Sequence, residues 1–103
     1  MEKFEFESLL NKVLDYYAEK LKFKNKNYGN SALNPPNIFS KSDAEEQLKV
    51  SIDHKLSRIK NKGIDGDEKE DSLDDLIGYL ILLKIELLLQ KKPTENEAVA
   101  FIR

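Results

Sequence analysis

Apolar residues recur every three or four positions along most of the chain, which is the period of an amphipathic α-helix. In the first segment they form a single stripe, and neither Gly nor Pro interrupts it. The spacing predicts a first helix over residues 4–22. The stripe consists of Phe6, Leu9, Leu10, Val13, Leu14, Tyr17 and Leu21.

A second helix is predicted over residues 43–60. Ser42 and Glu45 have the Ser-x-x-Glu spacing of a capping box, in which the two side chains satisfy backbone N–H groups at a helix start. Gly63 follows the segment and marks its end. The apolar face of this predicted helix is formed by Leu48, Ile52, Leu56 and Ile59.

A third helix is predicted over residues 71–91. It begins among acidic residues, which the helix dipole favours, and Pro93 blocks its continuation. Thr94 and Glu97 form a second capping box, so a short helix is expected over 95–102. No stretch alternates as a β-strand would. The sequence thus predicts a single all-α domain, residues 1–103, with three main helices and a short C-terminal one.

The third predicted helix is apolar around more than half of its circumference. A helix of this kind must be buried on several sides, and two partner helices hardly suffice for that. We therefore expect a helical bundle completed by oligomerisation, as a homo-oligomer of two or more copies. The apolar residues are Leu73, Leu76, Ile77, Leu80, Ile81, Leu83, Ile85, Leu87 and Leu88.

Residues 25–41 are predicted to form an ordered loop. The adjacent Pro35 and Pro36 exclude a helix there, and Ile38 and Phe39 favour a loop that packs against the protein. Between positions 20 and 42 the chain has five lysines and no acid. Such a loop can present lysines and backbone N–H groups to an anion, and the alternative is a packed loop with solvated lysines.

Composition excludes several classes of protein. The 103 residues carry 17 Lys and Arg against 19 Asp and Glu, and this formal charge of −2 argues against bulk binding of nucleic acid. The absence of Cys excludes disulfides and thiolate chemistry, and a single His excludes a site with two imidazoles from one chain. The N-terminus lacks the pattern of a signal peptide, and the longest uncharged apolar stretch is too short to cross a bilayer. We expect a cytoplasmic protein with no membrane partner.

Carboxylates on the second and third predicted helices are candidate metal ligands. Asp71 and Asp75 are four positions apart on the third helix and roughly aligned with Tyr79 and Glu86. Glu46 and Asp53 lie on one flank of the second helix. Oxygen ligands of this kind suit Mg²⁺ or Mn²⁺. The alternative is a set of solvated faces with intrahelical ion pairs.

The other flank of the second predicted helix carries Lys55 and Arg58, which are candidate phosphate ligands. His54 lies between charged neighbours, and we interpret it as a surface residue rather than a ligand. Glu45 projects near the apolar stripe, for which a capping role is the simplest interpretation.

Three segments, taken in order, resemble the nucleotide modification associated domain 1 family of small all-α proteins common in bacteriophages. They are Tyr28-Gly29-Asn30-Ser31, residues 52–59 and residues 71–79, so the resemblance spans about residues 20–90. It implies a connection with modified-nucleotide pathways in a host cytoplasm, without implying an established reaction.

More distantly, the second and third predicted helices look like MazG-type nucleoside triphosphate pyrophosphohydrolases. Those enzymes hold Mg²⁺ with a Glu-Glu-x-x-Glu motif on one helix and a Glu-x-x-Asp motif on the next. Here Lys49 stands at the third acid of the first motif and Ser72 at the first acid of the second, while Asp75 matches. A lysine in place of a ligand weakens a metal cluster, so the resemblance supports nucleotide binding better than hydrolysis.

Three functions follow, in order of preference. The first is binding of a phosphorylated nucleotide or nucleotide-derived signal in a pocket between helices or subunits; in a phage this could sequester a host defence signal. The second is Mg²⁺-dependent pyrophosphohydrolysis with Glu46, Asp53, Asp71 and Asp75 as metal ligands. The third is a purely structural role. The predicted ligand-binding residues are Lys24, Lys26, Tyr28, Gly29, Asn30, Ser31, Lys55, Arg58 and Tyr79.

Overall fold

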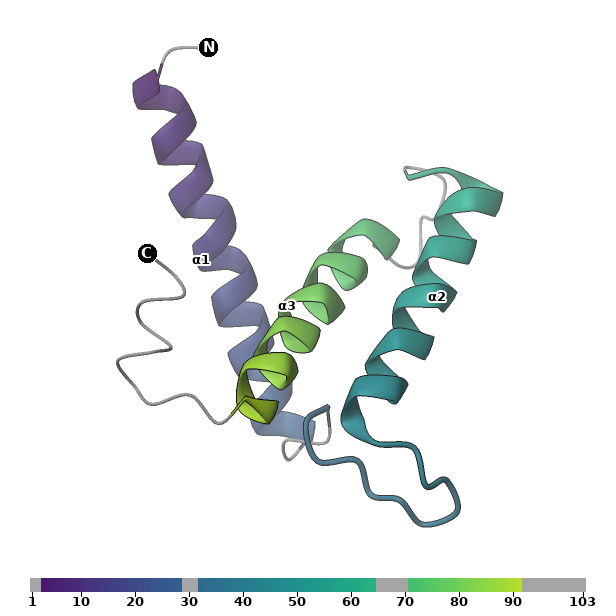
Figure 1. The fold of residues 1–103 in the computed structure, drawn as a ribbon. Helices are drawn as coiled ribbons and strands as arrows, with labels where there is room; N and C mark the ends of the chain where they lie inside the picture. Colours follow the sequence, from purple (N-terminus) through teal and green to yellow (C-terminus); the bar gives the residue numbers. More distant parts are fainter. Residues whose placement is uncertain (1–2, 29–31, 65–70, 92–103) are drawn as a thin grey trace. The chain divides into compact units, whose positions relative to one another are not determined.

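A computed structural model describes residues 3–28, 32–64 and 71–91, and these residues form helices and connecting turns without any strand. The helices are α1 (Lys3–Tyr28), α2 (Ala44–Lys62) and α3 (Ser72–Gln90) (Figure 1). The prediction of an all-α fold is therefore confirmed, whereas the short helix expected over 95–102 lies outside the described residues. None of the described helices combines the length and apolarity that a membrane crossing requires.

The chain divides into two compact units, with α1 in the first and α2 and α3 in the second. The prediction of a single domain stays a prediction.

Helix α1 is longer than its apolar stripe predicts. It extends over 26 residues and ends at Tyr28, because residues 23–28 contain neither Gly nor Pro to stop it. The expectation of a loop from residue 25 was therefore wrong for 25–28, and Lys24 and Lys26 belong to a helix. Within this helix, the Lys20 ammonium lies 5.6 Å from the centre of the Tyr16 ring, a cation–π contact between residues one turn apart.

The segment before α2 is ordered by hydrogen bonds rather than by apolar packing. Asn37 adopts a positive φ of 48°, and its side-chain amide donates to the carbonyl oxygens of Ser40 and Ser42, at 2.9 and 2.8 Å. Ile38 and Phe39 are 80% and 98% exposed, so the expectation that they pack against the protein was wrong. A local polar turn satisfies the backbone without needing either side chain.

Both helices of the second unit begin at an aspartate. The Asp43 carboxylate accepts from the backbone N–H of Glu46 at 2.9 Å, so the cap of α2 lies one residue beyond the predicted Ser42. The Asp71 carboxylate caps α3 in the same way, accepting from the N–H of Asp74 at 2.8 Å. Helix α2 ends at Gly63, whose positive φ of 80° suits glycine. The second and third helices are confirmed to within two residues of their predicted bounds.

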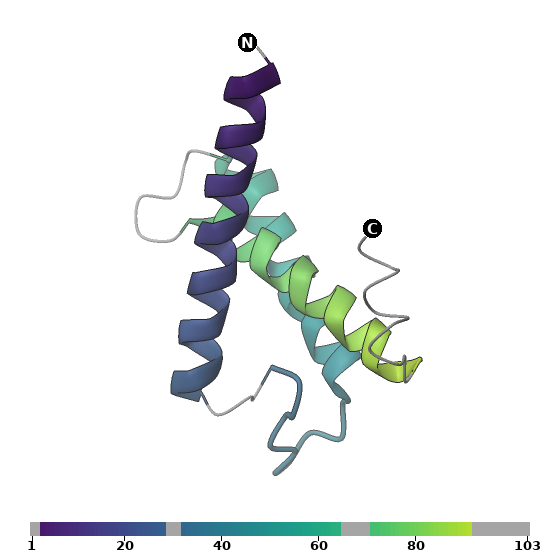
Figure 2. The same cartoon turned by 90° about the vertical axis from the view of Figure 1, so that its left-hand side faces the viewer.

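Helices α2 and α3 pack side by side and run in opposite directions (Figures 1 and 2). The buried apolar core on α2 is small, and consists of Ala44, Leu48 and Ile52, spaced four apart on one face. On α3, the buried positions are Ser72, Asp74 and Gly78. Among the described residues of the second unit, α2 is the helix that packs against α3, and the expected burial of the third helix on several sides stays a prediction. Its exposed apolar residues are Leu73, Leu80, Ile85, Leu87 and Leu89.

Two polar contacts tie the pair of helices together, one towards each end. Near the start of α3, the Lys55 ammonium lies 3.1 Å from the Asp75 carboxylate. At the other end, the Gln90 amide donates to the Glu45 carboxylate at 3.0 Å. Because each contact joins one helix to the other, the two fix the antiparallel register that the small core leaves loosely specified.

Glu45 is thus a tie between helices and not a cap. Its carboxylate also accepts from the Lys49 ammonium one turn along α2. The hydrogen bond from Lys49, and then that from Gln90, hold the pKa of Glu45 below its ordinary value of 4.5. The same contact with Glu45 raises the pKa of Lys49 above 10.5.

We predict that Leu48→Ala lowers the free energy of unfolding by about 2–3 kcal/mol, because Leu48 is 3% exposed and the cavity cannot collapse fully. The matched control is Val50→Ala on the same helix, where the side chain is half exposed and the change should stay within about 0.5 kcal/mol. Urea denaturation followed by circular dichroism measures both. Equal losses in the two variants would contradict the assigned core.

We predict that the stabilising effect of Glu45 depends on pH. A lowered pKa means that folding favours the carboxylate, so its stabilisation is present above pH 4.5 and is lost as the pH falls through the folded-state value. The difference in unfolding free energy between the natural protein and Glu45→Gln should therefore shrink below pH 4.5. In a Lys49→Met background this pH-dependent part should be smaller, since the largest cause of the shift is gone. A difference that does not change with pH would refute the tie.

Candidate functional site

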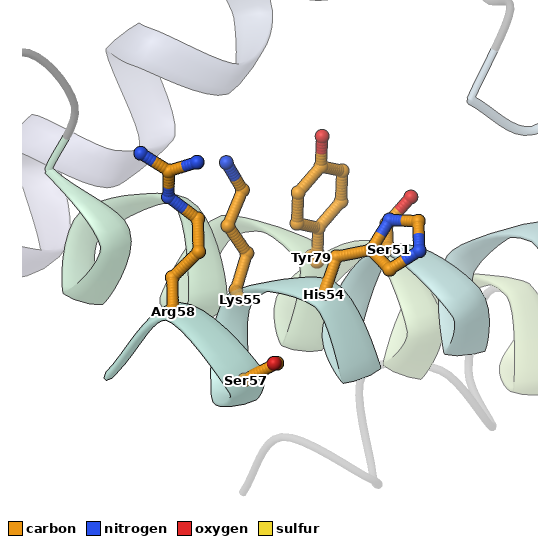
Figure 3. Close-up of a pocket in the computed structure, with 6 residues that line it drawn as sticks. All are labelled: Ser51, His54, Lys55, Ser57, Arg58 and Tyr79. Carbon is orange, nitrogen blue, oxygen red and sulfur yellow. The ribbon is translucent and has the colours of Figure 1, made fainter. Parts of the chain in front are cut away.

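An open hollow of about 450 Å³ lies on the second unit, along α2 and beside α3. Five of its lining residues come from α2 and one from α3 (Figure 3). Most of the α2 residues are three or four positions apart, which places them on one face of the helix. The lining consists of Ser51, His54, Lys55, Ser57, Arg58 and Tyr79.

The hollow is rich in hydrogen-bond donors. Figure 3 shows the side chains of Lys55, Arg58 and Tyr79 extending in the same direction from the two helices. Arg58 carries five N–H donors and Lys55 three, Tyr79 adds a phenolic hydroxyl, and His54 adds an imidazole. Among the residues that the structure describes, no carboxylate lines the hollow. Such a set suits an anion with several oxygen atoms, above all a phosphate.

Lys55, which lines the hollow, forms an ion pair with Asp75 of α3. The side chains of the pair are 15% and 22% exposed, so water screens their attraction less than that of a surface pair. The carboxylate holds the ammonium at the line where the two helices meet. It also offsets the charge of Lys55, so a bound anion would share Lys55 with Asp75.

The structure brings together three of the predicted ligand-binding residues, namely Lys55, Arg58 and Tyr79. Lys24 and Lys26 are exposed on α1, in the other unit, and Tyr28 is the last residue of that helix. Gly29, Asn30 and Ser31 lie outside the described residues. Lys55, Arg58 and Tyr79 thus line one hollow, and ligand binding by any of the predicted residues stays a prediction.

The predicted metal ligands are not gathered into one site. Asp71 caps α3, and Asp75 is paired with Lys55, which would repel a cation. Glu46 and Asp53 are exposed on α2. Among the residues that the structure describes, no three carboxylate or imidazole groups are close enough to hold a metal ion. These four residues therefore do not fit Mg²⁺ in the described arrangement.

Three residues of the hollow were not among the predicted site residues: Ser51, His54 and Ser57. His54 was expected on the surface, and it is indeed exposed, but it also lines the hollow. The signal was present in the sequence, since Ser51 is four positions before Lys55 and His54 is four positions before Arg58, a spacing that places each pair on one side of the helix.

No protein-family model matches the chain, and no curated protein or solved structure is detectably similar to it. The resemblance to the nucleotide modification associated domain 1 family and to MazG-type enzymes therefore stays a prediction. The fold and the hollow are assigned from the structure alone.

We predict that Lys55 and Asp75 are energetically coupled. A double-mutant cycle with Lys55→Met and Asp75→Asn should give a coupling free energy of about 1 kcal/mol, because the pair is mostly shielded from water. The exposed pair Lys22 and Glu19, 3.4 Å apart on α1, is the control and should give a value near zero. Urea unfolding supplies all the free energies. Coupling no larger than in the control would show that the Lys55 contact does not hold the helices.

Proposed function

We propose that the protein binds a phosphorylated nucleotide, or a signal derived from one, in the hollow on α2 and α3. The observation that supports this is that Lys55, Arg58, His54 and Tyr79 line one open hollow, whose described lining contains no carboxylate. A cavity of about 450 Å³ is within the range that small ligands occupy. The site is proposed between helices of one chain rather than between subunits.

Five of the six lining residues have a role in this proposal. The planar guanidinium of Arg58 binds phosphate oxygens in a two-pronged contact, and the ammonium of Lys55 acts as a point charge beside it. The Tyr79 ring, or the His54 imidazole, stacks on the base, which any nucleobase allows. Ser51 supplies a hydroxyl at the edge of the hollow. Selectivity for a given base would have to come from further contacts.

Binding is preferred to turnover because of how the acids are placed. The alternative, a Mg²⁺-dependent MazG-like pyrophosphohydrolase, needs several carboxylates around the metal, and the described acids are dispersed over caps, an ion pair and exposed faces.

The proposal has two further parts, which concern location and self-association. The protein acts in the cytoplasm, and it self-associates, which would cover apolar side chains such as Leu80 and Leu89 that the lone chain leaves exposed.

We predict that Arg58→Ala weakens nucleotide binding at least about tenfold, since a hydrogen bond to a charged group contributes about 1.5–3 kcal/mol. The matched control is Lys60→Ala, which removes one positive charge from an exposed position on the same helix outside the hollow. Titration calorimetry against nucleoside mono-, di- and triphosphates and cyclic dinucleotides measures the effect. Equal loss in both variants, or no binding of any member at high micromolar concentration, would overturn the proposal.

A further inference from the structure

Helix α1 carries an apolar stripe that nothing in its own unit covers. It is the one helix of that unit, in the part of the chain that the structure describes. Along the first half of the helix the stripe is about half exposed. The exposed fractions are 55% for Phe6, 47% for Leu9, 42% for Leu10, 50% for Val13 and 54% for Leu14. An isolated helix is marginal in water, so a long α1 needs a partner for this face.

The stripe is long enough to pack along another helix. Phe6, Leu9, Leu10, Val13 and Leu14 recur every three or four positions, so they lie on one face of α1. Each of these side chains is between 42% and 55% exposed, so apolar area remains to be buried along this face. Phe4, Tyr16 and Phe23 are also more than half exposed but lie away from this face.

The charges of α1 are unevenly distributed, and this favours a direction for a partner helix. Residues 20–28 have four lysines and no acid, whereas residues 3–19 have four acids and two lysines. Glu5 and Glu7 lie near the N-terminus, and four lysines at 20, 22, 24 and 26 lie in the last turns. A second α1 in the parallel direction would set glutamates beside glutamates and lysines beside lysines. In the antiparallel direction each acidic end meets a basic end, and the stripes overlap around Val13.

We infer that α1 is a self-association helix that pairs antiparallel with α1 of a second copy of this chain. The inference rests on the self-association in the proposed function and is independent of nucleotide binding. It places the contact on α1, although the composition of the third helix favoured that helix as the interface.

The first experiment measures the mass of the full chain by sedimentation at several concentrations. The natural protein should form a dimer. Val13→Glu, in the middle of the stripe, should raise the dimer dissociation constant at least about tenfold. Asn11→Glu adds the same charge at an exposed position outside the stripe and should leave the dimer intact. Circular dichroism checks that Asn11→Glu keeps its helix content and that Val13→Glu loses at most the part that belongs to α1, since α1 depends on the pairing.

The outcomes separate this inference from the proposal it rests on. A natural protein that is monomeric at every concentration overturns both self-association and α1 pairing. A dimer that survives Val13→Glu overturns α1 pairing alone and assigns the contact to another face, such as α3. A monomer that binds anionic lipid vesicles through α1 identifies the stripe as a membrane-surface helix and overturns the inference.

The second experiment tests the direction of pairing. Since the chain has no cysteine, Glu5→Cys and Lys22→Cys each introduce a single thiol. These positions are about 26 Å apart along one helix, further than a short bis-maleimide linker reaches. Mixing the two variants should give a cross-linked heterodimer, and Glu5→Cys alone should give none. Efficient cross-linking of Glu5→Cys to itself would mean parallel pairing and would overturn the antiparallel arrangement.

Discussion

The ion pair between Lys55 and Asp75 joins α2 to α3 and sets how the two helices of the second unit are aligned. Helices α2 and α3 share a small apolar core, and antiparallel helices with so few buried side chains can slide past one another. A charged contact of 3.1 Å that is mostly shielded from water has a narrow geometric optimum, so it opposes sliding more strongly than apolar contacts do. The hydrogen bond between Gln90 and Glu45 has the same effect at the other end, where exposure makes it weaker.

The same ion pair also shapes the hollow. Lys55 lies between Asp75 on one side and the open surface with Arg58 and Tyr79 on the other. A residue that stabilises the helix pair therefore also supplies positive charge to the candidate site. A ligand that binds the Lys55 ammonium would therefore also affect the contact between the two helices.

Local signals in the sequence were sufficient to predict the helices. They were not sufficient to predict contacts between residues that are distant in the sequence. The apolar period predicted α2 and α3 closely, since caps at Asp43 and Asp71 and the glycine at 63 act within a few residues. The end of α1 was missed because its last turns carry no apolar pattern, only the absence of helix breakers up to Tyr28. Helical spacing brought Lys55 and Arg58 to one face. The contact between Asp75 and Lys55, which makes Asp75 unsuited to a metal, depends on how α2 and α3 are aligned. No local sequence pattern predicts this alignment.

The exposed stripe of α1 has a consequence for how the protein behaves on dilution. A helix that is stabilised by a second copy has a folding equilibrium that includes the concentration of that copy. Helix content should then fall with dilution in the first unit, while α2 and α3, which are tied to each other within one chain, keep theirs. The abundance of the protein would in this way set how much of its N-terminal helix exists at all.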